Sequence, residues 1–151
     1  MLERLELPSY PKTSGASGLH ILLPLAARYT YEETRTFAHL LATLAVEAQP
    51  ALATIARMIR TRGGKVYVDY GQNGHGQTIV APFSVRPLPG APVSCSLRWS
   101  EVTAKLDPRR YTLATLPARL DEIGDPMAAV LGAGVDIAAA LGRLDATPHR
   151  R

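Results

Sequence analysis

Two segments of the chain carry residue types that bind phosphate. The loop at residues 12–18 is rich in glycine, serine and threonine, and His20 follows it closely. Such a loop presents backbone N–H groups and hydroxyls to an anion, so Ser14 and His20 can converge on one phosphate. The Gly-Lys-Ser/Thr ending of a P-loop is absent, and the alternative is an ordinary turn beside a half-exposed histidine. Arg86, in a segment bounded by prolines, is either a phosphate clamp or one of many surface arginines.

Asp69 is the candidate metal ligand. In the alternating run of residues 65–70 it shares a face with Lys65 and Tyr67, away from the apolar valines. Mg²⁺ or Mn²⁺ used in phosphoryl transfer is held by one or two carboxylates together with substrate phosphates. The alternative is an acid that caps a turn or pairs with a lysine. The 4 histidines are scattered and do not form a zinc pattern.

A basic run and two amides suggest contacts with nucleic acid. The net charge is +4 and the isoelectric point about 9.5. Arginines that follow one another closely can track a phosphate backbone, while amide side chains can bond bases or sugars. The alternative is a solvated helix face. The candidate DNA contacts are Arg60, Arg62, Gln72 and Asn73.

The first half of the chain alternates short strands with helices. Residues 18–24 alternate as a strand, and Thr30 with Glu33 forms a capping box that predicts a helix ending before Pro50. A second helix is predicted over residues 52–61. The Gly63-Gly64 pair is then expected to begin a hairpin-like return into a strand at residues 65–70.

The second half is rich in turns. It predicts a polar turn at residues 71–76, an extended segment from 78, a strand at 93–97 and a helical turn at 99–102. Helices are predicted over residues 115–123 and 126–144, the second capped by Asp125 and weakened by Gly132 and Gly134. This mixture predicts an α+β fold, a mainly antiparallel sheet with helices packed on one face.

Composition indicates a single folded domain. The chain has 151 residues, of which 46% are hydrophobic and 20% charged, close to globular averages. We expect a domain at residues 1–145 followed by a basic disordered tail at 146–151. No apolar run reaches the roughly 18 residues of a membrane span, and the amino terminus does not resemble a secretory signal. With Cys95 as the only cysteine, expected in the core, the sequence predicts a cytoplasmic, nucleoid-associated protein without a membrane partner.

Taken together, the segments resemble a known family. The matching stretches are Pro-Lys-Thr-Ser-Gly-Ala-Ser-Gly-Leu-His (11–20), Lys-Val-Tyr-Val-Asp-Tyr-Gly-Gln-Asn (65–73) and Thr-Ile-Val-Ala-Pro-Phe-Ser-Val-Arg-Pro-Leu-Pro-Gly-Ala-Pro-Val-Ser (78–94). In order and spacing they resemble the carboxy-terminal half of the polymerase domain of bacterial DNA ligase D, a member of the archaeo-eukaryotic primase superfamily. The resemblance runs from about Leu5 to about Met127 and implies a primase-polymerase-like catalytic half.

The resemblance implies a role for each candidate residue. Ser14, His20 and Arg86 match residues that bind the triphosphate of an NTP or dNTP, and Asp69 matches a ligand of Mn²⁺ or Mg²⁺. The implied activity is metal-dependent addition of nucleotides, often ribonucleotides, to DNA ends in non-homologous end-joining repair. The implied partners are DNA ends, Ku and a ligase polypeptide.

Two departures from the family bear on activity. Ser17 stands where the family usually has a lysine, and no Asp-x-Asp pair is present. One carboxylate does not readily hold two cations, so we expect another chain, a missing amino-terminal half, to supply the pair. Acting alone, the chain would have to recruit acids such as Asp107, Asp121 and Glu122, or dimerise. The alternatives are a non-catalytic nucleotide- or DNA-binding remnant and a degraded gene product with a residual fold.

Overall fold

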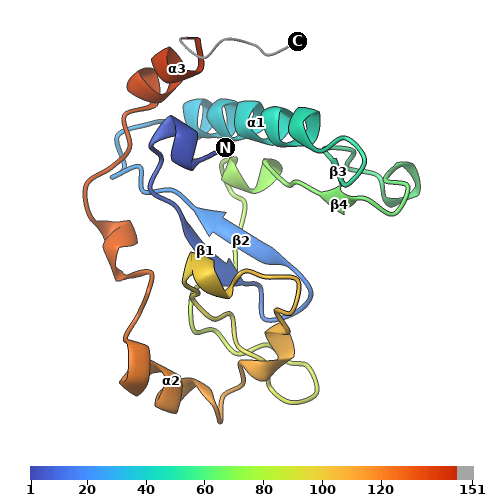
Figure 1. The fold of residues 1–151 in the computed structure, drawn as a ribbon, viewed down its shortest axis with the longest axis vertical. Helices are drawn as coiled ribbons and strands as arrows, with labels where there is room; N and C mark the ends of the chain where they lie inside the picture. Colours follow the sequence, from blue (N-terminus) through green and yellow to red (C-terminus); the bar gives the residue numbers. More distant parts are fainter. Residues whose placement is uncertain (146–151) are drawn as a thin grey trace. The chain divides into compact units, whose positions relative to one another are not determined.

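A computed structural model describes residues 1–145, which form two compact units (Figure 1). Unit 1 consists of Met1 and residues 27–79, and unit 2 consists of residues 2–26 and 80–145 of the described chain. The predicted basic tail at 146–151 lies outside the described residues. Within residues 1–145, no helix is both long and apolar enough to cross a membrane.

Unit 1 is built on α1 (Tyr31–Ala48), the longest helix in Figure 1. The predicted capping box is confirmed. Thr30 Oγ1 accepts a hydrogen bond from the backbone N–H of Glu33, whose carboxylate accepts one from the backbone N–H of Thr30. These bonds satisfy N–H groups that the first turn of a helix leaves unpaired. The helix buries Phe37 and Leu41, which a spacing of four residues places on one face, and also Ala42 beside them.

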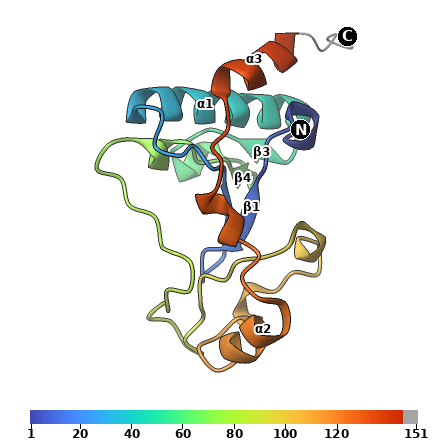
Figure 2. The ribbon, with the colours of Figure 1, turned by 90° about the vertical axis from the view of Figure 1, so that its left-hand side faces the viewer.

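A two-stranded parallel ladder, β3 (Ala53–Thr54) with β4 (Val66–Tyr67), runs beside α1 in both Figure 1 and Figure 2. The predicted helix at residues 52–61 is therefore wrong, and only η2 (Ile59–Thr61), a 3-10 turn, is helical there. Backbone carbonyls that a helix would use serve the ladder, because Leu52 accepts from the backbone N–H of Val66. The return is parallel, so the expected hairpin is also wrong, although Gly63 and Gly64 do adopt positive φ angles.

The strand expected at residues 65–70 is shorter than predicted. Beyond β4, the chain passes through Val68, whose backbone N–H donates to the carbonyl of Thr54, and then enters a 3-10 turn, η3 (Gly71–Asn73). This turn packs against α1. The polar turn predicted at 71–76 is therefore present, anchored to the helix.

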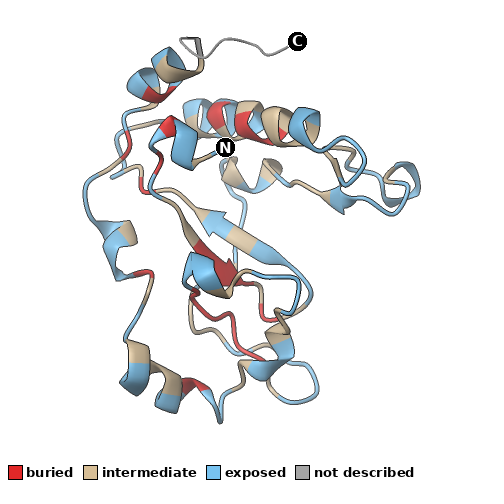
Figure 3. Cartoon of the chain, viewed as in Figure 1, coloured by how far each residue is buried: buried red, intermediate tan, exposed pale blue. Residues whose placement is uncertain are grey.

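Unit 2 is organised around an antiparallel pair, β1 (Tyr10–Thr13) and β2 (Leu19–Leu22). The segment 92–97 is buried beside β1, as Figure 3 shows in red, and contains Val93, Cys95 and Leu97. Further antiparallel bridges join Lys12 to Ser96, Val85 to Val93 and Pro92 to Thr112. The mixed α+β class and its mainly antiparallel pairing are thus confirmed, as is the core position of Cys95, where burial raises the pKa of the thiol.

Short helices complete unit 2. They are η1 (Glu3–Leu5), η4 (Trp99–Glu101), η5 (Pro108–Arg110), α2 (Leu116–Ile123), η6 (Ala128–Leu131) and α3 (Ile137–Asp145). The turn predicted at 99–102 and the helix predicted at 115–123 are confirmed. The continuous helix predicted at 126–144 is wrong, because the chain breaks between η6 and α3. A Cβ on Gly134 would lie 2.7 Å from the Cβ of Ala26, and the backbone N–H of Val135 donates to Pro24.

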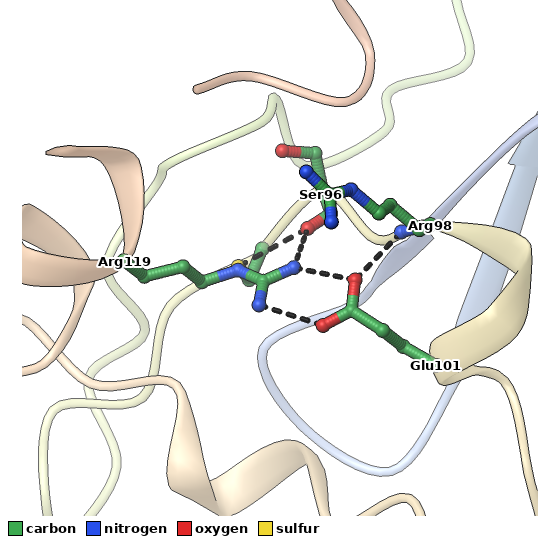
Figure 4. Close-up of polar contacts among 5 residues, drawn as sticks. Ser96, Arg98, Glu101 and Arg119 are labelled. Carbon is green, nitrogen blue, oxygen red and sulfur yellow. Dashed lines mark hydrogen bonds and ion pairs between the residues drawn. The ribbon is translucent and has the colours of Figure 1, made fainter. Parts of the chain in front are cut away.

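An ion pair fastens α2 to η4 (Figure 4). The guanidinium of Arg119 donates to both carboxylate oxygens of Glu101, at 2.6 and 2.7 Å, and to the carbonyl of Ser96 at 3.1 Å. Glu101 also accepts from the backbone N–H of Arg98. These hydrogen bonds hold the pKa of the Glu101 carboxyl below its usual range, the Arg119 contacts being the main cause.

Candidate functional site

Ser14 closes the loop that joins β1 to β2. Its backbone N–H donates to the carbonyl of Gly18 at 2.8 Å, and its Oγ accepts from the backbone N–H groups of Ala16 and Gly18 at 3.2 and 3.0 Å. The backbone N–H groups of Ala16 and Gly18, which the sequence predicted to bind an anion, are therefore bonded to Ser14 itself. The hydroxyl proton of Ser14 has no acceptor in the described part of the chain, so it can donate to an anion outside the loop.

Arg86 lies against the same loop. Gly15 has a φ of +72°, and a Cβ there would fall 2.5 Å from Cγ of Arg86 and 3.0 Å from the backbone nitrogen of Ser94. Only glycine allows this approach without displacement. The Nε of Arg86 is buried and has no hydrogen-bond partner among residues 1–145. The structure thus brings the Ser14 loop and Arg86 together, as the sequence predicted.

Lys12 was not predicted as a site residue. It is fully buried on β1, and its Nζ donates to Ser94 Oγ at 2.6 Å and to the carbonyl of Val80 at 2.8 Å. Burial, reinforced by the positive charge of Arg86, lowers the pKa of Lys12 to about 8. No local pattern marks this lysine, because its partners are 68 and 82 residues away in sequence.

His20 faces the same way as Lys12. The two residues are directly opposite in the β1–β2 ladder, and opposed residues of an antiparallel pair project from the same face. His20 is half-buried, in agreement with the sequence-based alternative of a partly covered histidine. The histidine, the buried lysine and the Ser14 loop therefore belong to one end of the hairpin.

This part of unit 2 has an excess of positive charge, since Lys12 is fully buried and Arg86 is half-buried with its Nε shielded from solvent. Lys12 and Arg86 repel each other, and no carboxylate of the described chain forms an ion pair with either. Burying like charges without a counter-charge is costly, whereas an anion beside them recovers that cost. The local electrostatics therefore favour an anionic ligand.

Asp69 lies in unit 1, on the segment between β4 and η3. It is exposed, as predicted, and its Oδ1 accepts from the backbone N–H of Gly71 at 2.8 Å and from the Tyr67 hydroxyl at 3.3 Å. Burial and the Asp69 charge raise the pKa of Tyr67. The alternative of a turn-capping acid is thus also realised, through Oδ1. Oδ2 has no hydrogen bond to another described residue, so this oxygen can coordinate a ligand.

Asp69 offers a carboxylate oxygen that can coordinate a metal ion at this position, and within residues 1–145 no cluster of ligands surrounds it. An exposed carboxylate with one oxygen oriented and the other unused suits Mn²⁺ or Mg²⁺, which prefer oxygen. Among the described residues, no group of three or more histidine, cysteine, aspartate or glutamate side chains could hold a metal ion. This agrees with the absence of an Asp-x-Asp pair from the sequence.

The candidate DNA contacts divide into two kinds. Arg62 donates to the carbonyls of Ala56 and Arg57 and lies over the Tyr67 ring, with 4.1 Å from its Cζ to the ring centroid. Asn73 donates to the carbonyl of Tyr70. Arg60 and Gln72 are exposed and make no side-chain hydrogen bond within residues 1–145, so they are available to a ligand.

Comparison with known proteins places the chain in a family. Residues 1–127 match the model of the LigD primase-polymerase domain. The chain belongs to the LigD primase-polymerase family. It is 39% identical over 127 residues to the bifunctional non-homologous end joining protein LigD of Bacillus subtilis, and 35% identical over 145 residues to the multifunctional LigD of Pseudomonas aeruginosa.

These LigD matches cover most of this chain but little of the relatives. They include 83% and 95% of the chain, yet only 21% and 17% of the two relatives. The polymerase domain of Mycobacterium tuberculosis ligase D, solved in complex with DNA, aligns with a TM-score of 0.80 and 28% identity, over 89% of this chain and 46% of that one. The LigD polymerase fold expected from the sequence is therefore confirmed.

Proposed function

We propose that this chain is the nucleotide-binding half of a LigD-type polymerase that adds nucleotides to DNA ends during non-homologous end joining. The observation that carries the proposal is a pair of cations, the fully buried Lys12 and the half-buried Arg86 with its buried Nε, that have no ionic partner among the described residues. They lie against the loop whose serine and following histidine match the family's triphosphate-binding motif. A nucleoside triphosphate supplies the missing negative charge.

Each residue of the unit 2 cluster has a distinct role in holding the triphosphate. Arg86 and the Ser14 hydroxyl donate hydrogen bonds to phosphate oxygens, and His20 contacts the same group. Lys12 adds positive electrostatic potential at the triphosphate. Its hydrogen bonds to Val80 and Ser94 also hold those two segments in place. Phosphoryl chemistry needs mainly positioning and charge stabilisation from the protein, which these groups provide.

Asp69 would hold the divalent cation, Mn²⁺ or Mg²⁺. When bound, that ion neutralises developing charge and lowers the pKa of a coordinated hydroxyl. The hydrogen bonds to Oδ1 orient the carboxylate beforehand. A second polypeptide, equivalent to the family's amino-terminal half, supplies the paired aspartates.

The wider setting of the proposal comes from the relatives. Curated relatives are named for non-homologous end joining, and the solved polymerase domain is in complex with DNA. By the same reasoning, this chain acts on DNA ends with NTPs or dNTPs and contacts the DNA through Arg60 and Gln72, while Arg62 and Asn73 hold the neighbouring backbone in place. Ku and a ligase polypeptide are the expected protein partners.

Single-nucleotide addition tests the proposal. A labelled DNA end with a 3′-overhang is incubated with Mn²⁺ and each NTP or dNTP, using the chain alone and the chain mixed with a LigD amino-terminal segment that contains Asp-x-Asp. We expect extension only in the mixture and its loss in Asp69→Ala. Glu47→Gln, which removes an exposed carboxylate from the same unit as Asp69, is the matched control and should extend normally. Extension by Asp69→Ala would sink the proposed role of this carboxylate.

The second candidate is a nucleotide-binding module without turnover. It is favoured by the absence of a three-ligand acidic cluster from the described residues. Fluorescent ATP binding separates the two. Binding that Arg86→Gln weakens, together with no extension in any mixture, would establish the module instead of the polymerase.

A further inference from the structure

Unit 1 has a surface pocket of about 560 Å³ between α1 and the turn that follows Asp69. Apart from Gly74, the lining residues are polar or aromatic, and none of them serves in the proposed function. They are Tyr31, Glu32, Arg35, Thr36, His39, Tyr70, Gly74 and His75.

Two pairs of rings shape this pocket. Tyr31, Arg35 and His39 recur every four residues and therefore share one face of α1. The Tyr31 ring meets His75 edge-on, with 5.3 Å between centroids, and His39 lies over Tyr70 at 4.2 Å with 34° between the ring planes. Arg35, between the two helix residues of these pairs, places its Cζ 6.0 Å from the Tyr70 centroid.

The rings are held in place and yet face solvent. Tyr31 is 61% exposed, and His39 and His75 are exposed as well. Arg35 is exposed and forms no ion pair with a described carboxylate, although Glu32 lies on the same pocket wall. Exposed ring faces beside a guanidinium provide stacking for a base together with a charge for its phosphate.

The composition of the wall argues against a protein occupant. No leucine, isoleucine, valine or methionine lines the pocket, whereas the buried centre of a protein interface is apolar and poor in charge. The location argues for nucleic acid. Tyr70 follows Asp69 directly, and the hydrogen bond from the backbone N–H of Gly71 to Asp69 fixes the turn that presents both.

We propose that this pocket binds an unpaired base of single-stranded DNA, stacked on the rings from α1, with Arg35 on the adjoining phosphate. The inference rests on the proposed function, because a strand that reacts beside Asp69 must pass the neighbouring turn. In this proposal α1 binds the single-stranded overhang of the DNA end, and it does so with residues other than the triphosphate-binding residues of unit 2.

Fluorescence anisotropy tests the site without nucleotide or metal. The probes are a labelled oligothymidylate of about 12 nucleotides and an abasic oligomer of the same length. We expect Tyr31→Ala and His39→Ala each to weaken oligothymidylate binding by about 5-fold or more, and to leave abasic binding unchanged. Tyr31→Phe and His39→Phe keep a ring and should keep the affinity. Leu131→Ala, at a residue 91% exposed in unit 2, is the matched control.

Arg35 is tested by salt dependence. Arg35→Gln should weaken binding of both oligomers and lower the slope of log K against log salt by about 1. Arg109→Gln, which removes an exposed guanidinium from unit 2, should leave the slope unchanged.

Two results would overturn the inference: ring variants that weaken both oligomers equally, or ring variants that weaken neither. Failure of the proposed function is recognised separately. If no mixture extends DNA but the ring variants still discriminate between the two oligomers, the polymerase assignment fails and the base-binding pocket stands.

Discussion

Gly15 is the residue on which the approach of Arg86 to the Ser14 loop depends. Its positive φ and the 2.5 Å gap to Arg86 Cγ leave no room for a side chain. Two of the atoms that a Cβ would meet belong to the backbone of Val93 and Ser94, so they cannot move aside as a flexible side chain can. The close packing of Arg86 against the Ser14 loop therefore requires glycine at position 15.

We predict that Gly15→Ala costs more stability than its backbone angle alone explains. Gly90→Ala is the matched control, because Gly90 has a φ of +84° and nothing within 4 Å of its Cβ position. The control should lose about 1 kcal/mol from the positive φ, and Gly15→Ala a further 1 to 3 kcal/mol, roughly, from overpacking. Urea unfolding measures both variants. Equal losses would show that Arg86 does not press on the loop.

Lys12 should impose a pH dependence on stability. Its pKa of about 8 in the folded state is below the ordinary value of about 10.4, so the unfolded chain binds more protons between these limits. The free energy of unfolding should therefore rise with pH in this window, relative to Lys12→Met, by at most about 1.4 kcal/mol per pH unit.

Urea titrations at pH 8, 9 and 10, roughly the limits of that window, measure the Lys12 effect. Lys105→Met, which removes an exposed ammonium, is the control. Parallel curves for the wild type and Lys12→Met would contradict the shifted pKa. A saturating nucleoside triphosphate should raise the pKa of Lys12 again, because its negative charge favours the ammonium form. The pH dependence of the difference in unfolding free energy between the wild type and Lys12→Met should then become smaller.

At the scale of elements, the ion pair between Glu101 and Arg119 attaches α2 to η4. Their side chains are 25% and 17% exposed, and the guanidinium also satisfies the carbonyl of Ser96. The exposed pair of Arg109 and Asp107 offers a contrast, since it joins neighbours on one turn and links no two elements. Only the first pair constrains the tertiary structure.

We predict that Glu101→Gln destabilises the protein by about 1 to 2 kcal/mol at neutral pH, after allowance for solvent screening. Because the pKa of Glu101 is lowered in the folded state, this contribution is present at neutral pH and fades as the pH falls below about 4.3. Thermal unfolding at neutral pH and at low pH measures the difference. Asp107→Asn should unfold like the wild type.

Local signals in the sequence predicted some elements and missed others. The capping box of Thr30 and Glu33 determines the start of α1 whatever surrounds it, so the prediction was correct. Residues 52–61 have helical spacing, but their partners are on β4, and tertiary pairing overrides a weak local preference. The helix expected at 126–144 was broken by packing of Gly134 on Leu25 and Ala26, which is equally non-local.

The candidate site was predictable in part for the same reason. Ser14, His20, Asp69 and Arg86 were proposed from motifs that resemble a family, because the residue types that suggest this chemistry stand within each motif; their roles stay predictions. Lys12 was missed because its burial depends on Val80 and Ser94. The pocket on α1 was missed because it needs η3 to fold back onto the helix.

At the scale of the whole molecule, burial is unequally distributed. In the described chain, unit 1 buries Phe37, Leu41 and Ala42, whereas unit 2 holds the continuous buried segment 92–97. The β3–β4 ladder is short, and Val66 is 69% exposed. Opening of such a ladder exposes little apolar surface and so costs little.

We predict that the buried segment 92–97 and the β3–β4 ladder exchange amide hydrogens at different rates. The N–H groups of Val93 and Ser94, bonded to the carbonyls of Tyr111 and Ser84, should be among the slowest. Those of Val66 and Val68 should exchange at least about 10-fold faster, since about 1.4 kcal/mol less is needed to open them. Mass spectrometry or NMR measures the rates. Equal protection of segment 92–97 and of the β3–β4 ladder would contradict the prediction.

The discontinuity of unit 2 has a consequence for the order of synthesis. The β1–β2 hairpin leaves the ribosome before the later part of unit 2, and Ser94, which accepts from Lys12, is made 82 residues after that lysine. At about 5 to 20 residues per second, the lysine waits roughly 4 to 16 s for that partner. Meanwhile residues 27–79, an uninterrupted stretch, can assemble unit 1. The nascent chain therefore completes the unit that carries Asp69 before the cluster around Arg86 can form.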